Sequence, residues 1–91
     1  MELGFLGKII DALSSHNGHH DFLFDDNAIV NLEIKDEEKP CKLIEIDFTE
    51  EDDTPFLCYE VVNENCCGTV GLELLSDAEI ERVYNALIKQ Y

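Results

Sequence analysis

Four segments in the middle of the chain alternate apolar and polar residues, and this alternation constrains the fold more than any other feature. The segments are residues 28–35, 41–48, 56–63 and 69–74. Successive side chains of a β-strand point to opposite faces, so a period of two predicts strands that are buried on one face. The connections between the segments are short, and short connections favour antiparallel neighbours. The sequence therefore predicts a four-stranded antiparallel meander.

Two helix patterns flank the predicted strands. Residues 2–14 carry apolar side chains at helical spacing, and Asn17 or Gly18 can supply a left-handed cap after them. Near the other end, Ser76 and Glu79 have the spacing of a capping box, and an apolar stripe follows at helical spacing. We expect the order α-β-β-β-β-α, with both helices packed on one face of the sheet.

Length and composition favour one α+β domain over residues 1–91. The chain has 91 residues, of which 45% are hydrophobic, so it can bury a core and is not a disordered acidic tail. Its formal net charge is −15, from 21 acidic and 6 basic residues. Such a charge disfavours direct contact with nucleic acid or with an anionic membrane, and it favours fast association with basic protein surfaces.

The apolar faces of the predicted strands set an expected register. Pairing Ile46 with Val30 on one side and with Tyr59 on the other aligns the apolar rows of three strands, one row on each strand. Pairing Tyr59 with Leu72 adds the row of the fourth strand. A slip by one residue would turn each of these rows toward water, so the register is strongly specified wherever one face is buried. In this register Ile44 also faces the helices.

The opposite face of the expected sheet then carries acids. Glu45 and Asp47 fall on it, and Glu60 lies directly across from Glu45. Like charges in direct opposition cost about 0.2–1 kcal/mol, so stability alone would not select this pair. Acids at alternate positions of a strand sit ~6.6–6.8 Å apart, which is of the same order as the phosphate spacing along a nucleic-acid strand.

A run of acids joins the second and third predicted strands and extends the charge to one rim of the sheet. We therefore expect a non-enzymatic protein that imitates nucleic-acid charge, occupies a basic nucleic-acid-binding surface of a partner protein and inhibits that partner. Inhibitors of the anti-CRISPR, anti-restriction and nuclease-immunity types resemble this chain in size and acidity only. The expected partner-binding residues are Glu45, Asp47, Glu60, Glu50, Glu51, Asp52 and Asp53.

Two other classes of function stay open. In the first, the chain is an adaptor or a homodimer that binds through its helices, where Phe5 and Tyr91 would matter and the acids only keep the protein in solution. In the second, the loop histidines His16, His19 and His20 hold zinc or nickel. The cysteines do not support the second class, because no Cys-x-x-Cys spacing is present. We therefore expect no metal and no cofactor.

Motifs of catalysis and of targeting are missing from the sequence. No glycine-rich phosphate loop, nucleophile elbow or zinc-protease helix motif occurs, so no catalytic residues are expected. The first residues lack the pattern of a secretory signal peptide, and four cysteines without such a signal are expected to stay reduced. The expected location is the cytoplasm.

Overall fold

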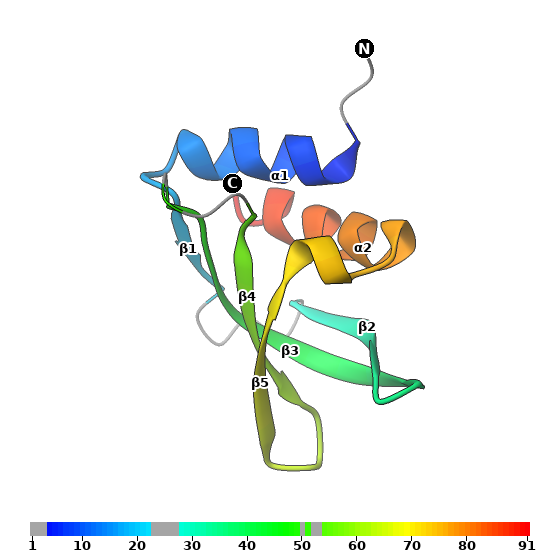
Figure 1. Cartoon of the computed structure of the whole chain (residues 1–91). Helices are drawn as coiled ribbons and strands as arrows, with labels where there is room; N and C mark the ends of the chain where they lie inside the picture. The colour runs from blue at the N-terminus through cyan, green and yellow to red at the C-terminus, as the bar shows by residue number, and fades with distance from the viewer. Residues whose placement is uncertain (1–3, 23–27, 50, 52–53) are drawn as a thin grey trace.

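The structure is a computed structural model that describes residues 4–22, 28–49, 51 and 54–91. Its elements follow one another as α1 (Phe5–Ser14), β1 (His19–Asp21), β2 (Ile29–Ile34), β3 (Glu37–Asp47), β4 (Phe56–Val61), β5 (Cys66–Gly71), the 3₁₀ helix η1 (Leu72–Leu74) and α2 (Asp77–Ile88). The predicted α+β class, the antiparallel sheet and the two flanking helices are confirmed (Figure 1).

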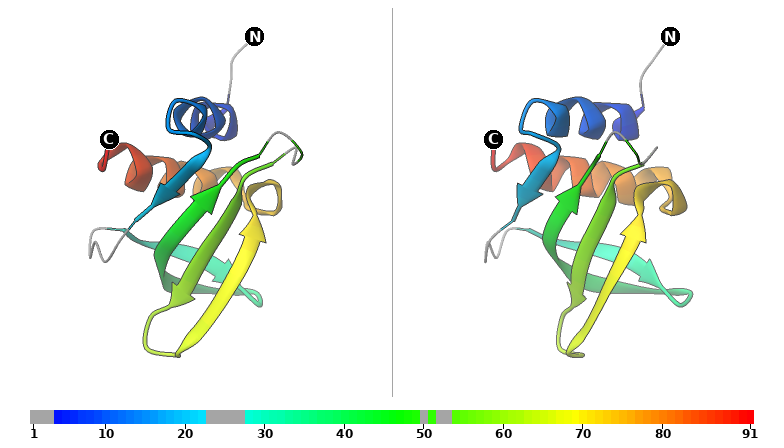
Figure 2. Two further views of the ribbon diagram at one scale, coloured as in Figure 1. Left: turned by 90° about the vertical axis from the view of Figure 1, so that its left-hand side faces the viewer. Right: turned by 60° about the vertical axis from the view of Figure 1, so that its left-hand side comes forward.

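Strand β3 is the centre of the sheet. The strand order is β1-β3-β4-β5, and β2 pairs with the first half of β3 along the same edge that β1 uses near its end. Every pairing is antiparallel. In both views of Figure 2 neither α1 nor α2 lies in front of the strands β1, β3, β4 and β5, and α1 lies above them. The side of the sheet turned away from the helices, here called the outer face, therefore has no helix over it.

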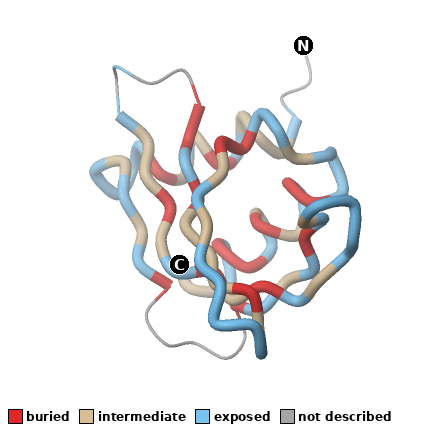
Figure 3. Tube along the Cα trace, turned by 60° about the horizontal axis from the view of Figure 1, so that its bottom comes forward, coloured by how far each residue is buried: buried red, intermediate tan, exposed pale blue. Residues whose placement is uncertain are grey.

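Both helices and the inner face of the sheet share one hydrophobic core. Helix α1 contributes Ile9 and Leu13, and α2 contributes Val83 and Leu87, all fully buried. Figure 3 shows buried positions alternating with exposed ones along the elements. The inner face of the sheet supplies further fully buried side chains, which include Leu32, Cys41, Leu43, Ile46 and Leu57.

A β-bulge in β3 changes which residues face this core. Leu43 pairs with Tyr59 and Glu45 with Cys58, so Ile44 is an extra residue without a partner on β4. Ile44 is 40% exposed, whereas Leu43 is buried. The expectation that Ile44 faces the helices is wrong. Leu43 and Ile46 are three residues apart and could not both point inward from a regular strand, and the extra residue Ile44 allows both to be buried.

The sheet has five strands instead of the predicted four, because residues 19–21 form β1 in a region expected to be a polar loop. His19 pairs with Asp47, His20 with Ile46 and Asp21 with Glu45. A three-residue polar strand is too short to show a period of two, so the sequence pattern could not reveal it.

The register between β2 and β3 also differs from the expected one. The strands meet in a two-residue turn at Lys35 and Asp36, whose φ angles are 50° and 69°. Such a turn suits the twist of a hairpin and normally uses glycine, asparagine or aspartate; Asp36 fits this preference, but Lys35 does not. Val30 consequently pairs with Cys41 and not with Ile46.

The last strand lies earlier in the sequence than predicted. Val70 pairs with Leu57, and residues 72–74 form η1 instead of continuing β5. Leu74, expected on the inner face, is 76% exposed. The backbone N–H of Leu72 still bonds to the carbonyl of Pro55 at 3.0 Å, so the chain leaves the sheet directly after this bond.

The predicted capping box at the start of α2 is confirmed, and its Glu79 side chain also bonds to strand β2. The Ser76 side chain accepts a hydrogen bond from the Glu79 N–H at 3.2 Å, and the Glu79 carboxylate accepts one from the Ser76 N–H at 3.1 Å. The other carboxylate oxygen of Glu79 accepts the N–H of Glu33 on β2 at 2.9 Å. Burial raises the pKa of Glu79, but the hydrogen bonds from Glu33 and Ser76 outweigh it, so the pKa lies below its usual value.

Replacing Glu79 with alanine should lower the free energy of unfolding by about 1–3 kcal/mol, because two backbone donors lose their acceptor. Urea unfolding followed by circular dichroism measures the change. Glu81→Ala on the exposed side of the same helix is the control, and we expect it to stay within about 0.5 kcal/mol of the parent. Equal losses in the two variants would contradict this role for Glu79.

The turn between α1 and β1 requires glycine at position 18. Gly18 has φ 76°, its N–H bonds to the Leu13 carbonyl at 2.7 Å, and its carbonyl accepts the Phe48 N–H at 2.6 Å. A Cβ atom at Gly18 would lie 2.2 Å from the Phe48 carbonyl oxygen. Asn17 precedes it with φ 62°, so both residues predicted as left-handed caps adopt that conformation.

Gly18→Ala should destabilise the fold by about 1–3 kcal/mol, since alanine is strained at this φ and its methyl group would press on β3. The matched control is Gly71→Ala, where φ is −73° and the nearest atoms lie 3.8 Å from the added carbon. We expect the control to change stability by less than about 0.5 kcal/mol in the same urea assay. A tolerated alanine at position 18 would refute the close approach of the turn to β3.

Candidate functional site: the acidic outer face of the sheet

The three sheet residues of the predicted binding site lie on one face. Glu45 pairs with Cys58, and Glu60 follows two residues after Cys58 on the same strand, so these side chains point to the same side. Asp47 follows two residues after Glu45 and joins them. All three residues are partly exposed. The predicted grouping of Glu45, Asp47 and Glu60 on the helix-free face agrees with this pairing.

The direct opposition of Glu45 and Glu60 is wrong. Because of the bulge at Ile44, Glu60 pairs with Lys42, which brings a positive charge across from it. The acid that pairs with Glu45 is Asp21 on β1. A like-charge pair does exist on the outer face, but one of its members lies in a strand that the sequence pattern did not reveal.

The turn that supplies the other predicted binding residues is described only in part. Glu51 is exposed. Glu50, Asp52 and Asp53 lie outside the described residues. Beside this turn, the Thr54 hydroxyl donates a hydrogen bond to the Glu73 carboxylate at 3.4 Å.

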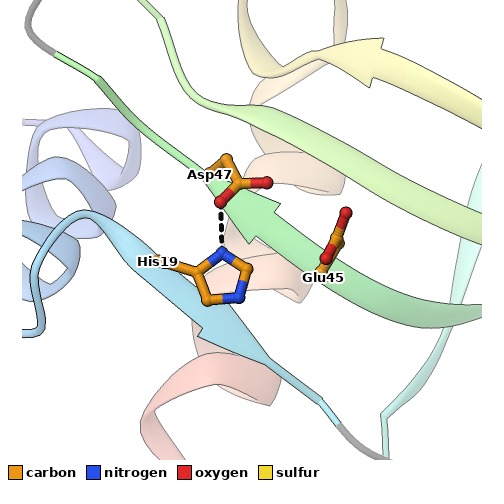
Figure 4. A group of neighbouring side chains, drawn as sticks. All are labelled: His19, Glu45 and Asp47. Carbon is orange, nitrogen blue, oxygen red and sulfur yellow. Dashed lines mark hydrogen bonds and ion pairs between the residues drawn. The ribbon is translucent and has the colours of Figure 1, made fainter.

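His19 stands among the carboxylates of β1 and β3. Its Nδ1 atom is in contact with Oδ1 of Asp47 (Figure 4). Its Nε2 atom is 2.8 Å from Oδ1 of Asp21. Ligand atoms of His19, Glu45 and Asp47 all lie within 4.8 Å of one another. We call these three residues and Asp21 the His19 cluster. The sequence suggested a histidine-rich loop here and did not connect His19 with Glu45 or Asp47.

The hydrogen bond with Asp47 raises the pKa of His19 above 6.5; slight burial opposes the shift, and Asp21 adds to it. The groups that face the imidazole are therefore carboxylates, and they favour the imidazolium form. A proton on His19 offsets part of the negative charge that Asp21, Glu45 and Asp47 bring together. Even with that proton, the His19 cluster keeps an excess of carboxylates.

The other two histidines belong to a different environment. The ring of His16 stacks on Tyr91 with centroids 4.0 Å apart, and the ring of His20 meets Tyr91 and Phe22 edge-on at 4.9 Å. Among the described residues, which include all three histidines, only His19 belongs to a group that could hold a metal ion. The proposed ligand set of His16, His19 and His20 is therefore not assembled.

The thiol of Cys58 borders the His19 cluster. Its sulfur lies 3.6 Å from Oε1 of Glu45 and 3.5 Å from the hydroxyl oxygen of Thr69. Cys58 pairs with Glu45 and lies beside it on the outer face. All four cysteines are free thiols.

Comparison with known proteins does not relate this arrangement to a family. No protein-family model, no curated protein and no solved structure matches the chain. Neither of the helices in the described ranges is long and apolar enough to cross a bilayer.

The raised pKa of His19 predicts a pH-dependent contribution to stability. The folded state holds this proton more tightly than the unfolded chain, so the contribution is complete below about pH 6.5 and is lost as the pH rises through the folded-state pKa. His19→Gln should therefore lower the free energy of unfolding more at about pH 5.5 than at about pH 9. Urea titrations in the presence of a chelator measure both values.

Asp47→Asn provides the control, because it keeps the imidazole and removes the partner that raises its pKa most. The pH dependence of stability should then shrink toward that of His19→Gln. Equal losses at the two pH values in His19→Gln would contradict the prediction.

Proposed function

We propose that the protein binds a basic, nucleic-acid-binding surface of a partner protein through the outer face of its sheet and thereby inhibits that partner. The observation that carries the proposal is the position of Asp21, Glu45, Asp47 and Glu60 on one helix-free face. The fully buried residues of β3 and β4, among them Leu43, Ile46 and Leu57, lie on the opposite face, so these acids stand on the face that a partner can reach.

Charge gives this face its preference for a partner. The formal net charge of the chain is −15, and a surface of this sign attracts Lys and Arg side chains and repels nucleic acid. Carboxylates form charge-assisted hydrogen bonds with the same groups that normally hold phosphates. The acids Glu45 and Asp47, two residues apart on β3, repeat at ~6.6–6.8 Å, a pitch of the order found along a nucleic-acid strand.

The energetics of the face also favour a binding role. The direct pairing of Asp21 with Glu45 costs about 0.2–1 kcal/mol relative to a neutral pair. Lysine or threonine at either position would relieve the repulsion without disturbing the core. His19 and Lys42 offset the acids only in part. A surface kept for solubility has no need to oppose two carboxylates across a ladder.

The adaptor or homodimer alternative draws on a different part of the molecule. Ile88 and Tyr91 are exposed near the end of α2, and a hollow of about 480 Å³ lies beside Phe5 and Ile80. The ring of Phe5 also contacts Tyr84 within the molecule, with centroids 5.5 Å apart. In this alternative the helices bind the partner and the outer face takes no part in binding. Substitutions on the outer face and substitutions on the helices therefore distinguish the two functions.

The test compares two triple variants, each of which removes three negative charges from a different part of the surface. The outer-face variant carries Glu45→Gln, Asp47→Asn and Glu60→Gln. The control carries the three exposed changes Asp11→Asn, Asp36→Asn and Glu81→Gln, which lie on the helices and on the β2–β3 turn. Immobilised protein captures partners from lysate at low salt, and about 0.5 M NaCl releases those held by charge. Each released protein is then tested for binding to a labelled oligonucleotide.

We expect the parent and the control to compete with the oligonucleotide for the released protein. The outer-face variant should compete at least tenfold less well, which corresponds to about 1.4 kcal/mol of binding free energy. Full competition by the outer-face variant would refute the proposal. Loss of binding in Ile88→Ser or Tyr91→Ser, with the outer-face variant unaffected, would support the adaptor instead.

A further inference from the structure

We infer that His19, Glu45 and Asp47 form a binding site for a divalent transition-metal ion of the zinc class, with Asp21 orienting the imidazole. This inference does not rest on the proposed inhibition of a basic partner. It rests on the geometry of two paired strands, on the hydrogen bond behind the imidazole and on the chemistry of the donor atoms.

Strand pairing holds the ligand residues in place. His19 is paired with Asp47, and Asp21 is paired with Glu45, so the backbone of two hydrogen-bonded strands carries all four side chains. The donor atoms of His19, Glu45 and Asp47 lie within 4.8 Å of one another (Figure 4). Ligands at ~2.0–2.1 Å from a tetrahedral zinc ion are ~3.3 Å apart, so modest side-chain rotations would close the site without moving the strands.

The contact between His19 and Asp21 has the form of an outer-shell hydrogen bond. Histidines that bind metals commonly donate their second ring N–H to a carboxylate, which fixes the tautomer and the orientation of the ring. Nε2 of His19 is 2.8 Å from the Asp21 carboxylate, and this leaves Nδ1 directed at Asp47. The carboxylate of Glu45 is also oriented by a hydrogen bond, which the Cys58 thiol donates at 3.6 Å.

The donor set indicates which ions fit. Calcium and magnesium take oxygen ligands, calcium six to eight of them and magnesium several waters, whereas an imidazole nitrogen with two carboxylates suits zinc and its neighbours in the transition series. The imidazole distinguishes this group from the other acids of the chain. Three protein ligands leave a coordination position for water, which the 43% exposure of the His19 side chain permits.

A bound ion would have a structural consequence. Strand β1 has three residues and is attached to the sheet through β3 alone. An ion shared by His19 and the acids of β3 would join the two strands and bring two positive charges to a crowded group of carboxylates. Ligands that bind only the folded state raise its stability, so the midpoint of thermal unfolding should rise with zinc concentration.

The experiment uses the full chain without a histidine tag, freed of metal by a chelator and titrated with ZnCl₂ in a calorimeter. We expect one zinc ion per chain, together with a rise in the midpoint of thermal unfolding. His19→Gln, Glu45→Gln and Asp47→Asn should each weaken binding at least tenfold, and Asp21→Asn should weaken it by about 10–100-fold. CaCl₂ and MgCl₂ at the same concentrations should not displace the zinc.

Three controls separate this site from others in the chain. The first control is Glu60→Gln, on the same face but outside the His19 cluster. The second is His16→Gln, and the third is the double variant Cys66→Ser, Cys67→Ser; both remove side chains of a type that could bind zinc elsewhere in the chain. All three should bind zinc like the parent. Circular dichroism shows whether each variant folds, and the exposed His19→Gln change keeps the test valid if Glu45→Gln does not fold.

Binding that survives His19→Gln would overturn the inference, as would binding lost only in the cysteine variant or equal affinity for calcium and zinc. The same variants distinguish this site from the proposed inhibition. Glu60→Gln should weaken competition for the partner and spare zinc binding, whereas His19→Gln should weaken zinc binding at least tenfold and leave the acids of the outer face in place.

Discussion

The β-bulge at Ile44 decides which side chains of β3 face the core and which face water. Before the bulge, Cys41 and Leu43 are buried; after it, Ile46 is buried. If β3 alternated regularly through Ile44, Glu45 would follow Leu43 into the core. An unpaired carboxylate there would be far more costly than a distorted ladder. The dry inner face and the acidic outer face therefore depend on the same local irregularity.

The central position of β3 brings distant parts of the chain to this outer face. Its first half pairs with β2, its end pairs with β1, and β4 lies along its other edge. Gly18 allows the turn after α1 to approach β3 closely, and β1 begins directly after it. His19 and Asp21 thus reach Glu45 and Asp47 across more than twenty positions of sequence. The His19 cluster is a product of strand pairing and not of any local motif.

Local and periodic features of the structure could be predicted from the sequence. The capping box of Ser76 and Glu79 depends on residues three apart, and the flanking helices have a clear apolar stripe. The outer-face positions of Glu45 and Asp47 were predicted because Ile46, between them, does face the core. The same period, extended through Ile44, gave the wrong face for Ile44 itself, since alternation alone cannot reveal an inserted residue.

Features that depend on pairing partners could not be predicted in this way. Three residues of β1 are polar and carry no periodic signal, so the sequence did not indicate that Asp21 would oppose Glu45. The Lys35–Asp36 turn lacks glycine and asparagine, and it moved the β2–β3 register away from the one that best aligned apolar rows. In both places a backbone arrangement that brings together distant or unusual residues prevailed over local preference.

The two proposals make opposite demands on Glu45 and Asp47. A partner with Lys and Arg side chains requires these carboxylates to be ionised and unoccupied, whereas a divalent ion would neutralise them and hold β1 against β3. Glu60 lies outside the His19 cluster, opposite Lys42, and an ion would leave its charge unchanged. Zinc and a basic partner would therefore compete at one end of the outer face and not at the other. Either ligand would lower the electrostatic repulsion between the paired acids Asp21 and Glu45.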